Sequence, residues 1–203
     1  MIAIVDYGLG NIRALLNVYK RLNIDVAVAV TGLELRGASK LILPGVGAFD
    51  HAMELLDRSG MRETLDEMVL ERGVPVLGIC VGMQILSRSS DEGCRPGLGW
   101  IPGRVRSLSG LGGKAIMLPH LGWNDVKPVL HSKLFSRLES EARFYFLHSY
   151  YMDCERPEHV AAFCNYGSEF ACAVALGNIH GVQFHPEKSH HYGTLLLKNF
   201  AEL

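Results

Sequence analysis

The sequence lacks the features that mark several large protein classes. It contains no CxxC pair, and its five cysteines are Cys80, Cys94, Cys154, Cys164 and Cys172. An odd number at wide spacing favours reduced thiols over a disulfide framework or a structural zinc site. There is also no excess charge to attract nucleic acid or an anionic membrane, because 20 basic residues face 21 acidic ones and the formal net charge is -1.

Long hydrophobic runs are missing too. The apolar start, Met1 to Val5, is interrupted by Asp6 and has no basic residue before it. It therefore predicts a first β-strand rather than a signal peptide or a membrane span, and cytoplasmic residence is the default expectation. No internal repeat, low-complexity segment or linker divides the chain, so residues 1–203 are predicted to form a single domain.

Short apolar runs alternate with amphipathic segments of helix length in the first half. Strands are expected at 2–5, 26–30, 40–43 and 74–79, and helices at about 11–22, 51–56, 62–72 and 81–87. Such alternation predicts βαβ units, and so an α/β fold with a mostly parallel central sheet flanked by helices. In the second half, strands are expected at 100–108, 114–118, 144–147, 160–163, 171–176, 178–181 and 182–184, and a last helix at 193–200. These closely spaced strands, with no helix-length segments between them, indicate additional antiparallel strands.

Cys80 is the strongest candidate for a nucleophile. It follows a buried strand, lies between Gly78 and Gly82, and precedes a helical segment. This G-x-C-x-G pattern is the thiol form of the nucleophile elbow, in which a tight strand-to-helix turn exposes the sulfur at the strand's carboxyl end. The amino terminus of the helix would favour the thiolate. The alternative is a structural buried cysteine, and the flanking glycines argue against it.

His185 and Glu187 are the candidates for the acid–base group and its orienting carboxylate. They follow an apolar strand in the run Phe184-His185-Pro186-Glu187. On an extended backbone, residues two apart point to the same side, so the carboxylate can hold the imidazole. A surface histidine beside a carboxylate is the alternative. The nucleophile motif about a hundred residues upstream favours the catalytic interpretation.

The segment Pro44-Gly45-Val46-Gly47 is the candidate oxyanion loop. It ends a predicted strand, and its two glycines allow a peptide N–H to face a developing oxyanion. The amide of Val81, directly after the nucleophile, is the natural second donor.

Together these motifs resemble the class I, triad-type glutamine amidotransferases over nearly the whole chain. Within that superfamily, the sequence is most similar to the glutaminase subunit of imidazole glycerol phosphate synthase. The segments that carry this similarity are IVDYGLGN (4–11), LPGVGAF (43–49), PHLGWN (119–124), YFLHSY (145–150) and GVQFHPEKS (181–189).

The resemblance implies a flavodoxin-like fold, L-glutamine as substrate, no cofactor, and a synthase (cyclase) subunit as partner in a heterodimer. It implies catalysis by Cys80, His185 and Glu187, with oxyanion amides at Val46 and Val81, the former after a peptide flip. It places glutamine against Gly45, Gly47, Gln84, His148, Ser149 and Tyr150. It places the partner interface or ammonia passage at His120, Trp123, Asn124, Tyr145 and Lys188, and His120, Trp123 and Asn124 are expected in a loop.

Other functions stay open on the sequence alone. The run Ile12-Arg13-Ala14 departs from the pattern of histidine-pathway members. Paralogues that supply ammonia for bacterial surface-sugar synthesis are therefore an alternative. A stand-alone thiol hydrolase and a non-catalytic binding module are two more.

Two further binding motifs are rejected. Gly8-Leu9-Gly10 lacks the third glycine of a dinucleotide loop, because position 13 is Arg13. The adjacent pair His190 and His191 has no carboxylate pattern to complete a metal site.

Overall fold

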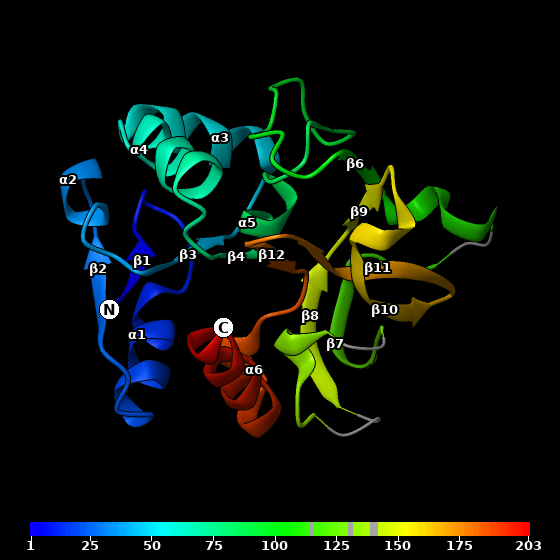
Figure 1. The fold of residues 1–203 in the computed structure, drawn as a ribbon. Helices are drawn as coiled ribbons and strands as arrows, with labels where there is room; N and C mark the ends of the chain where they lie inside the picture. The colour runs from blue at the N-terminus through cyan, green and yellow to red at the C-terminus, as the bar shows by residue number, and fades with distance from the viewer. Residues whose placement is uncertain (114–115, 130–131, 139–141) are drawn as a thin grey trace.

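Figure 1 shows a central sheet with helices on both of its faces. The computed structural model describes residues 1–113, 116–129, 132–138 and 142–203. The strands of the nine-stranded sheet, in spatial order, are β2 (Val26–Ala29), β1 (Ile2–Val5), β3 (Lys40–Gly45), β4 (Val76–Cys80), β12 (Ile179–Val182), β11 (Ser168–Leu176), β10 (Val160–Tyr166), β7 (His120–Pro128) and β8 (Arg143–His148). A three-stranded sheet contains β5 (Ser89–Ser90), β6 (Gly103–Ser107) and β9 (Tyr150–Cys154).

The α-helices form the outer layers. They are α1 (Ile12–Arg21), α2 (Gly32–Leu35), α3 (Phe49–Arg58), α4 (Arg62–Asp66), α5 (Val81–Gln84) and α6 (His190–Glu202). A π-helical turn, η1 (Glu67–Glu71), continues α4, and short 3-10 turns are η2 (Leu108–Gly113), η3 (Lys133–Phe135), η4 (Pro157–His159) and η5 (Pro186–Lys188). Helices α1 and α6 cover one face of the sheet, and α3, α4 and α5 cover the other (Figure 1). The hydroxyl of Tyr19 donates to the carbonyl of Leu197 at 3.1 Å and ties α1 to α6.

The large sheet has a parallel half and an antiparallel half. From β2 to β12 every neighbouring pair is parallel, and from β12 to β8 every pair is antiparallel. Strands β1 and β4 are buried along their whole length, as expected where helices cover both faces. In β7, buried and exposed residues alternate, so one face of this strand meets solvent. The predicted α/β fold, with extra antiparallel strands in the second half, is confirmed.

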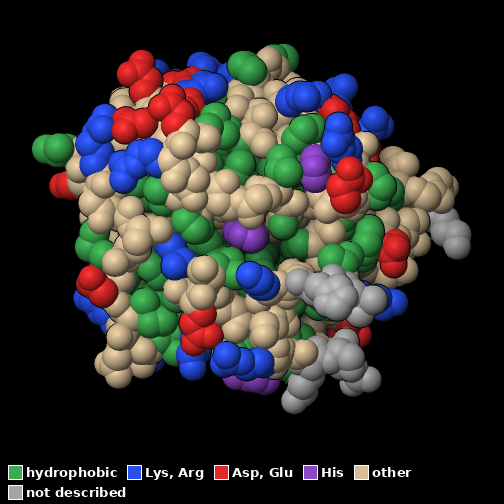
Figure 2. Space-filling model, in the orientation of Figure 1, with side chains coloured by type: hydrophobic (Ala, Val, Ile, Leu, Met, Phe, Trp, Pro, Cys, Tyr) green, Lys and Arg blue, Asp and Glu red, His purple; other side chains and the backbone are tan. Residues whose placement is uncertain are grey.

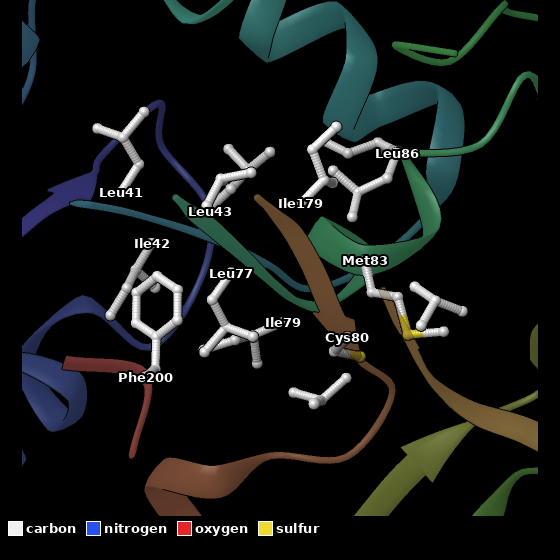
Figure 3. Packing of buried hydrophobic residues seen from close by; sticks show 14 of the residues in the cluster. Leu41, Ile42, Leu43, Leu77, Ile79, Cys80, Met83, Leu86, Ile179 and Phe200 are labelled. Atoms are coloured by element: carbon white, nitrogen blue, oxygen red, sulfur yellow. The ribbon is translucent and has the colours of Figure 1, made fainter. Parts of the chain in front are cut away.

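Side chains of the central strands fill both faces of the parallel half. Figure 3 shows Leu41 and Leu43 of β3 on the opposite side of the sheet from Ile42, which lies with Phe200 of α6. All four are fully buried, and Cys80 lies at the end of β4 beside this core. The nucleophile candidate is therefore held next to a closely packed core.

Several predicted elements differ in extent from the observed ones. The helix predicted at 81–87 ends at Gln84, because the loop that follows donates its amides to the carbonyls of Ile85 and Leu86. The helix predicted at 62–72 changes from α to π at Glu67. Strand β12 ends at Val182, so the strand predicted at 182–184 is wrong. The strand predicted at 114–118 lies partly outside the described residues, and 116–118 are not in a strand.

The expectation of a loop around His120, Trp123 and Asn124 is also wrong. These residues belong to β7, which pairs with β8 along 120–125 and with β10 along 126–128. Glycine and polar side chains gave the segment a composition typical of loops, but backbone pairing with β8 makes it part of a strand.

Acidic and basic side chains are interspersed over the face seen in Figure 2, as the balanced composition suggested. Within the described part of the chain, no helix combines the length and apolar character needed to span a bilayer. The five cysteines are all unpaired.

Candidate active site

The elbow geometry at Cys80 depends on the glycines on either side. Cys80 adopts φ 55° and ψ -114°, a left-handed conformation that costs a non-glycine residue about 1–3 kcal/mol. A Cβ atom on Gly82 would lie 1.8 Å from the carbonyl oxygen of Leu43, and one on Gly78 would lie 2.6 Å from the carbonyl oxygen of Gly82. The predicted elbow is therefore present, and glycine is required at both positions by backbone contact.

The sulfur is less exposed than the sequence suggested. Cys80 is only 4% exposed, so its thiol is reached through a pocket rather than standing on the surface. The helix after it, α5, is a single turn, and its dipole is correspondingly small. The amides of that turn remain the local source of positive potential.

Parallel pairing of β4 with β12 brings the second half of the site to Cys80. Val182 lies opposite Ile79, so the residues that follow, Gln183 and Cys80, leave the sheet at the same edge. The side-chain nitrogen Nε2 of Gln183 donates to Sγ of Cys80 at 3.7 Å. His185, two residues further on, lines the same pocket as Cys80 and is close enough for Cys80 to raise the pKa of its imidazole.

Glu187 orients His185, although by a different backbone path from the one expected. Nδ1 of His185 lies 2.9 Å from Oε1 of Glu187, and both side chains are buried. The backbone is not extended through this segment, because Pro186 begins the 3-10 turn η5. Proline suits the first position of a helical turn, and this turn still directs Glu187 back to the imidazole. The amide of His185 donates to the carbonyl of Tyr145 at 2.9 Å and anchors the segment to β8.

The electrostatics of His185 favour an imidazolium. Burial by itself would lower the pKa of this histidine, but hydrogen bonds to Cys80 and Glu187 and the negative charge of both partners outweigh it and raise the pKa to about 10. The ring can then donate from both nitrogens, to the sulfur on one side and to the carboxylate on the other. This is the charge state that activates a thiolate nucleophile.

A pocket of about 290 Å³ opens over Cys80 and His185. Its lining contains most of the residues that sequence reasoning assigned to glutamine and to the oxyanion site. The lining residues are Val46, Gly47, Cys80, Val81, Gln84, Glu92, Pro119, Leu147, His148, Ser149, Tyr150 and His185.

Gly45 is the one predicted glutamine contact that does not line this pocket. It is the last residue of β3, and a Cβ there would lie 2.6 Å from the amide nitrogen of Gly82. Close packing of β3 on α5 accounts for a glycine at this position. Gly47, by contrast, lines the pocket and adopts φ +93°, and a Cβ there would have no atom within 4 Å.

Two buried glutamines connect Cys80 to the pocket wall. Nε2 of Gln84 donates to Oε1 of Gln183 at 3.0 Å and to the carbonyl of Tyr150 at 3.3 Å. Gln84 is 3% exposed and Gln183 is fully buried. The side-chain nitrogen of Gln84 therefore supports the pocket wall at Tyr150, whereas the side-chain oxygen of Gln84 takes no part in these two bonds.

The predicted interface residues separate into two groups. Trp123 is 40% exposed and stacks on His190, with ring centroids 5.0 Å apart. Lys188 is exposed, with its ammonium 5.6 Å from the ring centroid of Tyr145, which is half-buried. His120, however, is 2% exposed and lies behind this surface, so its place at the interface or ammonia passage stays a prediction.

Asn124 belongs with His120 rather than with the exposed group. It is half-buried, and its side-chain amide donates to the carbonyl of Asn165 at 2.9 Å and approaches Nε2 of His120 at 3.2 Å. Alternation along β7 explains the division, because its even-numbered residues 120–124 point inward and Leu121 and Trp123 point outward.

Sequence reasoning missed Glu92 and Gln183. Glu92 lines the pocket, and its Oε2 accepts from the amide of Phe49 at 2.9 Å. It lies in an irregular loop with no motif around it, so only the folded loop reveals its position. Gln183 stands two residues before His185, and its place beside Cys80 follows from the register of β12 against β4.

Comparison with known proteins gives a consistent result. A family model described as glutamine amidotransferase class-I matches residues 3–203. The chain is 63% identical to the imidazole glycerol phosphate synthase subunit HisH of Bdellovibrio bacteriovorus, with 100% of both chains covered. It is 50% identical to the subunit of the same name from Leptospira interrogans, again over 100% of both.

Solved structures that are more distant in sequence have the same fold. A crystal structure described as a glutamine amidotransferase aligns with TM-score 0.75 at 19% identity, covering 99% of this chain and 97% of that one. The structure of PurLQS from Thermotoga maritima aligns with TM-score 0.74 at 18% identity and the same coverage.

Proposed function

The chain belongs to the class I glutamine amidotransferases, and on that basis we propose that it is the glutaminase subunit of an imidazole glycerol phosphate synthase. In this proposal it hydrolyses L-glutamine and passes the ammonia to a synthase (cyclase) subunit, which makes imidazole glycerol phosphate and AICAR in histidine biosynthesis. The observation that carries the glutaminase part is the buried set Cys80, His185 and Glu187 at the base of a pocket. The full-length similarity to HisH subunits supports the histidine pathway over the surface-sugar alternative.

Catalysis begins with the Cys80 thiolate and the His185 imidazolium. The sulfur attacks the side-chain carbonyl carbon of glutamine, and the carbonyl π electrons move to the oxygen to give a tetrahedral oxyanion. When the C–N bond breaks, Nε2 of His185 gives its proton to the departing nitrogen, which leaves as ammonia. A glutamyl thioester remains on Cys80. Glu187 keeps Nδ1 protonated and holds the ring throughout.

Neutral His185 then acts as the base for hydrolysis. It takes a proton from water as the water oxygen attacks the thioester carbonyl, and glutamate leaves with return of the thiolate. Both tetrahedral intermediates need donors for the oxyanion. We assign this role to the amides of Val81 and Val46, which both line the pocket, the latter after rotation of its peptide. Gly47, with φ +93° and free space around it, allows that rotation.

Glu92 is the group best suited to the α-ammonium of the substrate. It is the carboxylate of the pocket lining, and the amide of Phe49 holds one of its oxygens in place. A charge-assisted bond from the ammonium to Glu92 would fix the end of glutamine remote from the reacting amide. Gly47, Gln84 and the 148–150 segment would bind the remainder.

Partner binding is assigned to the outer face of β7 and β8. Leu121 pairs with Leu147 and Trp123 with Tyr145 across the two strands, so these four side chains share that face. Leu121 is 59% exposed, and Leu147 and Trp123 are each 40% exposed, a clustering of large apolar groups that suits an interface. Leu147 also lines the pocket, which supports a partner surface next to the site where ammonia would form.

The proposal is tested by measuring glutamate release from the chain mixed with its synthase subunit. Cys80→Ala should abolish glutamine-dependent product formation while the synthase still uses added ammonia. Cys94→Ala is the matched control, because Cys94 is an exposed free thiol, and it should retain activity. Undiminished glutamate release by Cys80→Ala would rule out the thiol mechanism.

The same mixture separates the alternatives. Low glutaminase activity of the chain alone, raised by the synthase and its ligand, is the expected result. Full activity without any partner would indicate a stand-alone thiol hydrolase. Glutamate release without formation of imidazole glycerol phosphate would point to a different ammonia acceptor.

A further inference from the structure

Two buried histidines link strand β7 to the wall of the pocket. His120 of β7 and His148 of β8 are paired across the strands, and Nδ1 of His120 lies 2.9 Å from Nε2 of His148. Nδ1 of His148 lies 2.7 Å from the carbonyl oxygen of Tyr150. At the other end, Nε2 of His120 lies 3.2 Å from the side-chain nitrogen of Asn124. We call the path Asn124–His120–His148–Tyr150 the histidine relay.

Both ends of the relay fix its direction independently. The side-chain oxygen of Asn124 accepts from the amide of Asp125 at 2.8 Å, so its nitrogen faces His120 as a donor. The carbonyl of Tyr150 can only accept, so Nδ1 of His148 carries a proton. With both rings neutral, Nδ1 of His120 donates to Nε2 of His148, and every member then has a partner of the correct kind.

A proton added to either ring would break this pattern. It would place two donors face to face, either between the histidines or between His120 and Asn124. Burial lowers the pKa of His120 to about 4 and, together with neighbouring histidine charge, lowers the pKa of His148 to about 3. Both rings therefore stay neutral in the physiological range. His120 is also clamped between Phe146 and Tyr166, with ring centroids 4.6 and 4.1 Å away.

The relay ends where the backbone passes from one sheet to the other, at Ser149 and Tyr150. Ser149 lies between β8, in the large sheet, and β9, in the small one, so the chain changes sheets there. The carbonyl oxygen of Tyr150 accepts hydrogen bonds from both Nδ1 of His148 and Nε2 of Gln84. Ser149 and Tyr150 both line the pocket over Cys80. Their backbone is thus held by side chains that reach back to β7.

We propose that His120 is a positioning residue for glutamine binding, which acts by donating through His148 to hold the Ser149–Tyr150 wall of the pocket. This inference rests on the proposed function, because it assigns glutamine to that pocket. His120 is not itself a lining residue, and it reaches the pocket only through its bond to His148. Its loss should therefore weaken glutamine binding and leave the reactivity of the thiol itself unchanged.

The test compares His120→Asn with His120→Gln. Both variants remove the same stacked ring, but the amide of asparagine can replace Nδ1 and keep the bond to His148, whereas that of glutamine reaches the Nε2 position and does not. The measurement is alkylation of Cys80 by iodoacetamide in the full chain, with increasing glutamine as protectant. The alkylation rate without glutamine reports the thiol, and the protecting concentration reports the pocket.

We expect His120→Asn to be protected at a glutamine concentration close to that of the unaltered chain. His120→Gln should need about tenfold more, the effect of one buried hydrogen bond left unmade. Alkylation without glutamine should proceed at the same rate in all three. Equal protection of all three proteins, or equal weakening of the two variants, would overturn the relay and leave the glutaminase proposal standing. No protection of the unaltered chain would instead overturn the glutaminase proposal, and this inference with it.

A second measurement does not depend on whether a variant folds. Nitrogen NMR of the unaltered chain with labelled histidine should show both His120 and His148 protonated at Nδ1 only, from pH 5 to pH 8. The opposite tautomer at His120, or titration of either ring in that range, would overturn the proposal.

Discussion

Glu187→Gln isolates the contribution of one carboxylate to the charge state of the site. Glutamine keeps the shape of the side chain and an oxygen that can face Nδ1 of His185, now 2.9 Å from Oε1 of Glu187. The variant therefore removes the negative charge and little else. Because both side chains are buried, solvent screens this interaction weakly.

The size of the effect follows from the hydrogen bond. A bond to a charged group contributes about 1.5–3 kcal/mol, and a change of one in pKa corresponds to about 1.4 kcal/mol. The pKa of His185, raised to about 10 by Cys80 and Glu187 against the effect of burial, should therefore fall by about one to two in the variant. The Cys80 partner remains, so the pKa should stay above that of a free histidine.

The same change should appear in stability as a function of pH. A histidine whose pKa is raised by folding stabilises the protein fully below its unfolded pKa of about 6.5. That stabilisation is lost as pH rises through the folded pKa, near 10 here. In Glu187→Gln the loss should be smaller in total and complete at lower pH.

Carbon NMR of the labelled imidazole gives the pKa directly, and urea unfolding between pH 6 and pH 10 gives the linked stability. Glu92→Gln is the matched control, since it removes a carboxylate from the same pocket without touching His185. His185 titrating in Glu187→Gln as it does in the unaltered chain would refute the assigned role of the carboxylate. Titration of the unaltered chain near 6.5 would refute the ion pair altogether.

Three other predictions concern different parts of the molecule. Gly82→Ala should destabilise the fold by more than about 3 kcal/mol in urea unfolding, because its Cβ would lie 1.8 Å from the carbonyl oxygen of Leu43. Gly47→Ala, whose Cβ would meet no atom within 4 Å, should cost only about 1–2 kcal/mol for its φ of +93°. Glu92→Gln should raise KM for glutamine about tenfold or more with a smaller change in kcat, and an unchanged KM would remove Glu92 from the α-ammonium site. Trp123→Ala should weaken synthase binding by about 2–4 kcal/mol in calorimetry with little change in melting temperature, and undiminished affinity would move the interface elsewhere.

Local sequence was enough for the parts of the site that depend on local geometry. The spacing of Gly78, Cys80 and Gly82 predicted the elbow, because a tight strand-to-helix turn excludes side chains at fixed offsets from the nucleophile. The pairing of His185 with Glu187 was predicted from their spacing of two residues, although a 3-10 turn rather than an extended strand brings them together.

Residues whose role depends on distant neighbours were assigned less well. His120 was expected in a loop at a partner interface, yet it is buried in a strand, because β8 supplies the backbone pairing that its own composition did not suggest. Glu92 went unnoticed, because an irregular loop carries no periodic pattern to show where its side chain points.

The sequence by itself determined the fold class, the glycine-flanked turn at Cys80 and the pairing of His185 with Glu187, since hydrophobic periodicity and turn chemistry act over a few residues. The tertiary structure alone decided that Cys80 and Gln183 share a sheet edge, that Glu92 reaches the pocket, and that His120 bonds to His148. These contacts depend on strand order and register, which are set by the packing of the whole sheet and not by any single segment.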